Sequence, residues 1–227
     1  MPTKAVYFLA IPGFADWEAA HALAELRRHG HFRVEVVGLT RDAIQSMGGL
    51  TVQPTAALAE LDPDDVAVFI LPGGDRWEQQ PVERELVTVL KTLEARSVPI
   101  AAICAATTAV ARVGIITGRR HTSNGLGYLK KHVPDYSGAA MYVDAPAVRD
   151  RGLITASGLA DVEFANEIMA ELGVLGTAIA PCGPPYFAGA GSRPKPNKAT
   201  GRSRRQPQGG RCGNPRAGTL RGAIGSP

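Results

Sequence analysis

The chain has 227 residues, of which 44% are hydrophobic and 20% are charged, and its formal net charge is +4. This length suits one α/β domain with a buried core. Charge is uneven, because residues 176–227 carry nine Lys or Arg and no acid, whereas residues 1–175 hold 16 basic and 21 acidic side chains, a net −5. A basic nucleic-acid-binding groove on the folded part therefore has no support, and we expect no nucleic-acid partner apart from one of the basic tail.

The three cysteines, Cys104, Cys182 and Cys212, show no CxxC or CxxH spacing. Neither a structural zinc site nor a disulfide framework is predicted, and we expect a cytoplasmic location with no metal and no cofactor. The apolar run at 5–11 is too short for a signal peptide. The run at 100–116 is too short and too polar to span a membrane, so no membrane partner is expected.

Strands and helices are predicted to alternate along the chain. Continuous apolar runs indicate strands that are buried on both faces, and apolar residues at helical spacing indicate helices. Asp16 is expected to cap the first helix, which Gly30 ends. The expected strands are 6–11, 34–39, 66–71 and 99–103, with short ones near 141–143, 147–149 and 153–155 and a hairpin or edge excursion at 47–52; the further helices are 83–95, 105–113 and 162–172. This order predicts an α/β fold with a doubly wound, mainly parallel sheet and helices on both faces.

The composition changes after the last predicted helix. Gly and Pro make up 19 of the 52 residues in 176–227, and no apolar periodicity continues there. We therefore expect a folded domain at 1–175 and a disordered basic Gly/Pro/Arg-rich tail at 176–227. The tail is interpreted as an unselected or frame-shifted extension, with an RNA- or membrane-binding segment as the alternative.

Cys104 follows the predicted strand at 99–103 and precedes an Ala-rich helix. Ligand sites of open parallel sheets lie beyond the carboxyl ends of the strands. A cysteine on such a strand-to-helix turn is typical of a nucleophile elbow, and the helix N-terminus favours the thiolate and a lowered pKa. The alternative interpretation is a small buried side chain that only packs.

Two other segments are expected at the same edge of the sheet. Glu18 lies in the first turn of the first helix beside Trp17, which predicts a partly buried carboxyl that shares a proton with the cysteine. The alternative is an acid that only complements the helix dipole. Gly73 and Gly74 either end a strand or free N–H groups, and the N–H of Gly74 would then form an oxyanion hole with that of Ala105.

Six short segments together resemble the ThiJ/PfpI superfamily, the class I glutamine-amidotransferase-like group that includes relatives of the Parkinson-associated deglycase. The segments are F-A-D-W-E (14–18), S-M-G-G-L-T-V (46–52), I-L-P-G-G (70–74), A-A-I-C-A-A-T (101–107), R-R-H-T-S-N (119–124) and L-I-T-A-S-G (153–158). The resemblance implies a flavodoxin-like fold and a homodimer. It also implies that Cys104 is the nucleophile, that Glu18 bonds to its sulfur, and that Gly74 and Ala105 form the oxyanion hole.

The chain departs from the histidine-dependent branches of that superfamily. Ala105 stands where PfpI-type hydrolases have His, and no His follows His132, so the glutaminase triad is missing. Asn124 stands near the histidine of the deglycase-like branch and hydrogen-bonds without acting as a base. His121 is three positions away and is expected to face the other way. We expect Gly73, Asn124 and Trp17 to line the substrate pocket.

Three functions remain open from the sequence. The first is a hydrolase, hydratase or lyase that uses Cys104 and Glu18 on a small electrophile such as an aldehyde, an isonitrile or an amide. The second is a non-enzymatic stress-response protein that senses oxidants through Cys104. The third is a fold that binds a partner after losing activity.

Overall fold

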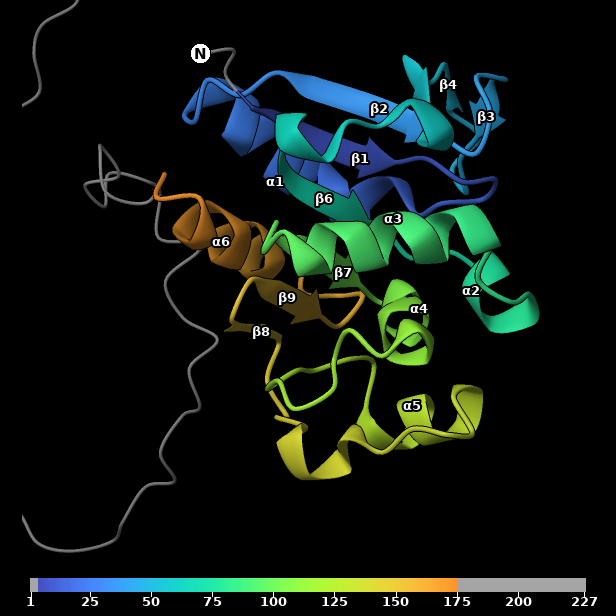
Figure 1. Ribbon diagram of the computed structural model, residues 1–227, viewed down its shortest axis with the longest axis vertical. Helices are drawn as coiled ribbons and strands as arrows, with labels where there is room; N and C mark the ends of the chain where they lie inside the picture. The colour runs from blue at the N-terminus through green and yellow to red at the C-terminus, as the bar shows by residue number, and fades with distance from the viewer. Residues whose placement is uncertain (1–3, 175–227) are drawn as a thin grey trace, which may run out of the picture. The chain divides into compact units, whose positions relative to one another are not determined.

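A computed structural model describes residues 4–174 of the chain (Figure 1). Its main sheet has seven strands in the order β5-β2-β1-β6-β7-β9-β8. Neighbouring strands are parallel except for β8, which runs antiparallel to β9. The strands are β1 (Ala5–Leu9), β2 (Val34–Gly38), β5 (Ala56–Ala57), β6 (Val66–Leu71), β7 (Ile100–Ile103), β8 (Ala147–Asp150) and β9 (Leu153–Ala156), and a separate hairpin pairs β3 (Ile44–Gln45) with β4 (Thr51–Val52).

Helices cover both faces of this sheet. The connection from β1 to β2 runs toward the β5 edge of the sheet, and the connection from β6 to β7 runs toward the β8 edge. Because crossovers between parallel strands are right-handed, α1 and α3 lie on opposite faces. Helix α1 packs against α6, and α3 packs against α4. The helices are α1 (Asp16–Arg28), α2 (Arg76–Gln79), α3 (Arg84–Ala95), α4 (Ala106–Val113), α5 (Leu126–His132) and α6 (Asp161–Glu171), with 3-10 turns at Leu58–Glu60, Pro63–Asp65 and Gly138–Met141.

The central strands form the core, as their apolar sequences predict. Every residue of β1, β6, β7 and β9 is buried. Strands β1, β6 and β7 are near-continuous apolar runs, as expected for parallel strands with helices on both faces. The doubly wound, mainly parallel fold is therefore confirmed, and it places the carboxyl ends of β1, β6 and β7 at one edge of the sheet.

Two local expectations are wrong, and two short helices were not predicted. The segment 141–143 is not a strand, because only a single bridge joins Tyr142 to His121 after a 3-10 turn. Helices α2 and α5 were not expected, since both are short and lack a clear apolar stripe. Asp16 does not cap α1 but is its first residue, after Ala15. Its carboxylate instead accepts hydrogen bonds from the Ser46 hydroxyl and from the N–H of Gly48, which ties the β3–β4 hairpin to α1.

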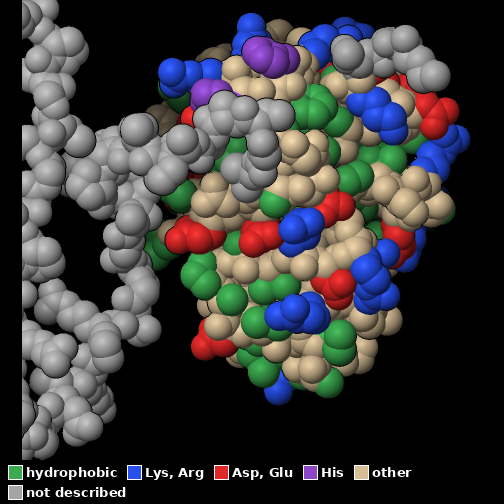
Figure 2. Space-filling view, turned by 90° about the vertical axis from the view of Figure 1, so that its left-hand side faces the viewer, with side chains coloured by type: hydrophobic (Ala, Val, Ile, Leu, Met, Phe, Trp, Pro, Cys, Tyr) green, Lys and Arg blue, Asp and Glu red, His purple; other side chains and the backbone are tan. Residues whose placement is uncertain are grey.

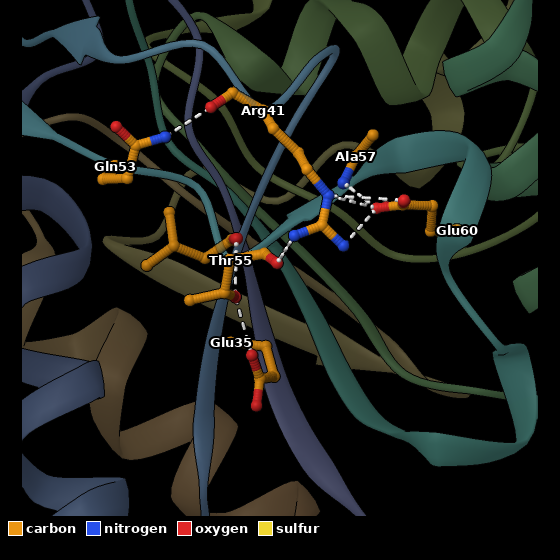
Figure 3. Close-up of polar contacts among 7 residues, drawn as sticks. Glu35, Arg41, Gln53, Thr55, Ala57 and Glu60 are labelled. Atoms are coloured by element: carbon orange, nitrogen blue, oxygen red, sulfur yellow. Dashed lines mark hydrogen bonds and ion pairs between the residues drawn. The ribbon is translucent and has the colours of Figure 1, made fainter.

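A polar network holds the chain at the β5 edge of the sheet (Figure 3). The guanidinium of Arg41 pairs with Glu60 and donates to the carbonyl of Thr55. Gln53 donates to the carbonyl of Arg41, and the hydroxyl of Thr55 donates to Glu35 at 2.7 Å. These groups are exposed, so each bond contributes little stability. The network fixes the path of the chain at the edge and lies apart from the residues predicted to carry chemistry.

The surface of the described residues shows no gathering of basic side chains on the face drawn in Figure 2, where charges of both signs are interspersed. Within residues 4–174, no helix is long and apolar enough to cross a membrane. The expectation of a disordered tail at 176–227 concerns residues outside the described part of the chain.

Candidate functional site

Cys104 lies directly after β7 in a backbone conformation that L-residues rarely adopt, with φ of +58°. The turn is fixed on both sides: its N–H donates to the carbonyl of Ala156 at 2.9 Å, and its carbonyl accepts from the N–H and the hydroxyl of Thr107. Strain of this kind costs about 1–3 kcal/mol and persists only where the surroundings impose it. The sharp strand-to-helix turn predicted from the sequence is present.

Glu18 reaches this turn from α1 and is 1% exposed. Its Oε2 accepts the N–H of Gly73 at 2.5 Å, and its carboxyl is also hydrogen-bonded to the thiol of Cys104. Two glycines leave the space for this pair. A Cβ on Gly73 would lie 2.6 Å from Glu18 Oε2, and a Cβ on Gly158 would lie 2.7 Å from Cys104 Sγ. The close approach of these two backbone segments therefore requires glycine.

Burial perturbs both members of the pair. Burial raises the pKa of Glu18 to about 7, opposed by the hydrogen bonds from Gly73 and Cys104. Burial likewise raises the pKa of Cys104 to about 11; the charge of Glu18 adds to this, and hydrogen bonds from Asn124 and the N–H of Ala105 oppose it. The expectation of a lowered cysteine pKa is therefore wrong, because burial and the neighbouring carboxylate outweigh the helix N-terminus.

The two groups titrate as one system, and one proton leaves it well before the other. The first proton leaves near pH 7, where the Glu18 carboxyl ionises. Above that pH the pair carries one negative charge and one proton, and the proton is shared between oxygen and sulfur. The pKa of about 11 for Cys104 then describes loss of the second proton from a site that is already anionic.

Asn124 completes the surroundings of the sulfur. Its Nδ2 donates to Cys104 Sγ at 3.2 Å, and its Oδ1 accepts the N–H of Gly158 at 2.9 Å. Trp17 is 47% exposed and donates from Nε1 to the carbonyl of Gly158 at 3.1 Å. The Glu18 carboxyl is buried, as expected, while Trp17 itself stays half exposed. Gly158, which was not singled out in the sequence although it ends the segment 153–158, packs against the sulfur.

The predicted oxyanion-hole groups lie at the ends of β6 and β7. Gly74 has φ of +154°, and a Cβ there would lie 2.9 Å from the carbonyl oxygen of Gly13, so the position demands glycine. Its N–H has no acceptor within residues 4–174. The N–H of Ala105 is directed at Cys104. The oxyanion hole itself stays a prediction.

His121 is not part of this site. Its Nδ1 lies 2.7 Å from the carbonyl of Arg119, so Nδ1 carries the proton and Nε2 accepts from the hydroxyl of Tyr136 at 2.7 Å. Burial lowers the pKa of His121. The ring is thus occupied on both nitrogens and packs between Tyr136 and Tyr142, away from the cysteine.

A cavity of about 440 Å³ opens beside Asn124. Its lining includes Ser123, Tyr142, Asp144 and Glu163, and Asn124 joins it to the sulfur of Cys104. Within residues 4–174, no group of three His, Cys, Asp or Glu side chains is arranged to hold a metal ion.

Comparisons with known proteins identify the family of the chain. The model of the DJ-1/PfpI family matches residues 4–171. YoaZ of Bacillus subtilis, named an uncharacterized protease, is 36% identical over 184 residues, 77% of this chain and 86% of that protein. A protein of Thermococcus kodakarensis named a deglycase is 31% identical over 118 residues, 52% of this chain and 70% of the relative.

A solved structure gives the same result for the fold. A DJ-1 superfamily protein from Agrobacterium tumefaciens matches with a TM-score of 0.71 at 35% identity, over 76% of this chain and 91% of that one. The sequence resemblance is thereby confirmed along the whole of the described sheet. This chain belongs to the DJ-1/PfpI family.

Proposed function

We propose that the protein is an enzyme that uses Cys104 as a nucleophile and Glu18 as the proton carrier on a small molecule with an electrophilic carbon. Hydrolase-like or stress-related roles fit relatives that are named protease and deglycase. The observation that carries the proposal is the buried pair itself, since a carboxyl with a pKa of about 7 is bonded to a cysteine held at φ +58°. Such perturbed groups are enriched at catalytic sites.

The pair supplies both reagents for addition to a carbonyl carbon. In the singly protonated state the sulfur attacks the carbon, the S–C bond forms, and the C=O π electrons move to oxygen. As the sulfur attacks, its proton passes to the Glu18 carboxylate, which then delivers it to that oxygen, so one proton and one electron pair account for the step. The same first step serves an aldehyde or an amide. With an isonitrile the sulfur adds to the terminal carbon and the proton goes to that same carbon, so that a thioimidate forms.

Other groups of the site support this step. Asn124 donates to the sulfur, and the free N–H of Gly74 together with the N–H of Ala105 is proposed to stabilise the developing oxyanion. Gly73 and Trp17 are proposed to line the substrate pocket with Asn124. The cavity beside Asn124 has room for a small substrate. His121 has no role in this proposal, because both of its ring nitrogens are already hydrogen-bonded, to Arg119 and to Tyr136.

The test is turnover by the full chain against a panel of small aldehydes, isonitriles and amides. We expect Cys104→Ala to abolish turnover, and Glu18→Gln to lower it by about 10²–10⁴-fold because the proton carrier is lost. Glu85→Gln, on the exposed start of α3, is the matched control. Full turnover by Cys104→Ala would refute the proposal.

Oxidant sensing is the second candidate, and the half-buried state of Cys104 favours it. Peroxide converts the thiol to a sulfenic acid with release of water, and the amide of Asn124 is positioned to hydrogen-bond the oxidised sulfur. Mass spectrometry after peroxide treatment measures the oxidation. Rapid gain of one oxygen at Cys104 without turnover of any panel member favours this candidate over the enzyme.

The remaining expectations stay proposals. We propose a cytoplasmic homodimer without a cofactor, whose folded domain is 1–175 and whose basic tail is 176–227. Exposed apolar side chains suit contact with a second copy, among them Trp17 on α1 and Met47 and Leu50 on the β3–β4 hairpin. Sedimentation of the full chain at micromolar concentration tests the dimer, and a monomer throughout that range would contradict it.

A further inference from the structure

Two helices that the sequence pattern did not indicate bring polar side chains to the cysteine site. Tyr128 on α5 donates its hydroxyl proton to Glu78 Oε1 on α2 at 2.8 Å. The hydroxyl oxygen of Tyr128 also accepts a hydrogen bond from the amide of Asn124, and the charge of Cys104 raises the pKa of Tyr128. Neither Tyr128 nor Glu78 contacts the sulfur directly through any hydrogen bond found among the described residues.

The polarity of this chain of hydrogen bonds is determined by its two ends. The N–H of Gly158 must face an acceptor, so it faces Oδ1 of Asn124. Nδ2 therefore presents both of its protons on the other side, one to Cys104 Sγ and one to Tyr128. Because the proton of Tyr128 is given to Glu78, its oxygen is left as an acceptor for the amide.

We propose that Tyr128 and Glu78 are positioning residues of the Cys104 site, which hold the amide of Asn124 as a fixed hydrogen-bond donor to the sulfur. The inference rests on the proposed role of Cys104 as nucleophile and not on turnover of any substrate. Asn124 alone is an exposed side chain that would lose orientational freedom on bonding to sulfur. Bonds to Gly158 and Tyr128 remove that freedom in advance, which makes the donor more effective.

The proposed arrangement favours the anionic sulfur. The hydrogen bond from Asn124 acts to lower the pKa of Cys104, against burial and the charge of Glu18. Asp161 at the start of α6 acts on the same pair by raising the pKa of Glu18 further. Loss of the hydrogen bond from the Asn124 amide therefore shifts the sulfur toward the protonated thiol.

The surroundings of Tyr128 keep its phenol protonated over the pH range in which Cys104 loses its proton. Burial, followed by the bond to Glu78, raises the pKa of Tyr128. The ring of His132 lies against it, with ring centroids 4.6 Å apart. Tyr128 thus acts as a fixed dipole between Glu78 and Asn124 rather than as a group that changes charge.

The test is a pH profile of iodoacetamide labelling in the full chain, read separately for each cysteine by mass spectrometry. Cys182 and Cys212 serve as internal references in every sample. We expect Tyr128→Phe to move the Cys104 profile upward by about one pH unit, which is about tenfold slower labelling at fixed pH. Glu78→Gln keeps an acceptor for the phenol and is expected to retain most of the wild-type rate.

Matched variants separate positioning from general destabilisation. Tyr136→Phe also removes a hydrogen-bonded hydroxyl, but one that serves His121, so it should leave the Cys104 profile in place. Glu78→Leu alters an exposed residue, so we expect the variant to fold. It should shift the profile in the same direction as Tyr128→Phe. Urea unfolding of each variant measures the structural cost independently.

Two results would overturn the inference, and they are distinguishable. If Tyr128→Phe and Glu78→Leu keep the wild-type Cys104 profile, Tyr128 and Glu78 do not position the amide, and the proposed nucleophile stands. If wild-type Cys104 itself labels in a single step with the same profile as Cys182 and Cys212, the coupled pair is absent, and the proposed function fails together with the inference.

Discussion

Burial of Glu18 should make the stability of the protein fall as pH rises. The pKa of Glu18 is raised from 4.5 to about 7 in the folded state. Between these values the folded protein binds a proton that the unfolded chain has released, so the free energy of unfolding decreases with increasing pH. A difference of about 2.5 pKa units amounts to about 3 kcal/mol, which is fully lost above pH 7.

Glu18→Gln removes this dependence, because the amide stays neutral and its oxygen still accepts the N–H of Gly73. As the pH rises from about 5 to 8, the free energy of unfolding of the variant should increase by about 2–3 kcal/mol relative to that of wild type. His121 contributes with the opposite sign, since its lowered pKa makes stability rise with pH as the unfolded histidine loses its proton. That contribution is common to both proteins and cancels in the difference.

The assay is urea unfolding of wild type and Glu18→Gln at several pH values across that window, with the slope of the transition checked for constancy. Glu85→Gln, at an exposed glutamate on α3, is the control for the loss of one surface carboxyl group. If the wild-type and Glu18→Gln curves stay parallel, Glu18 does not hold its proton through this range, and the explanation of the site by a shared proton is refuted.

Three further predictions concern the same region. The rate of Cys104 alkylation, measured by mass spectrometry, should rise in two steps, near pH 7 and near pH 11. Glu18→Gln should leave one step, and Glu18→Leu should leave one step at a higher pH. An unchanged profile in both variants would remove Glu18 from the site. Gly158→Ala should destabilise the fold by about 1–3 kcal/mol, because its Cβ would lie 2.7 Å from the sulfur, while Gly127→Ala meets nothing within 4 Å and should be nearly neutral or stabilising by thermal unfolding. Asp16→Asn should speed amide hydrogen exchange in the β3–β4 hairpin, and equal exchange would show that the carboxylate does not anchor it.

The sheet could be predicted because its signal is local. Strands β1 and β6 are apolar runs long enough to be recognised without knowledge of their neighbours, and the alternation with α1 and α3 fixes their parallel order. The short helices α2 and α5 could not be predicted in this way. Each is too short for periodicity to be visible, and each is stabilised by contacts such as that between Tyr128 and Glu78, which lie 50 residues apart.

The members of the site could be predicted by type, but their energetics could not. Cys104 and Glu18 were indicated by their places at strand and helix ends. The direction of the cysteine pKa was not, because it depends on the burial of the pair and on the closeness of the carboxylate, neither of which a helix N-terminus reveals. Gly158 was missed as a contact of the sulfur because its reason for being glycine is a tertiary clash and not a turn.

The site departs from ordinary stability rules in several places at once. Cys104 adopts a strained backbone conformation, and Glu18 is a buried acid. Gly73 and Gly158 lack the Cβ atoms that would clash with Glu18 and Cys104. Each feature alone costs stability, and none contributes to the core that the sheet already provides. Local rules that fail together around one sulfur atom are expected where a protein carries out chemistry. The same reasoning makes Glu18→Gln a discriminating variant, since it should stabilise the fold at neutral pH while it removes the proton on which the proposed reaction depends.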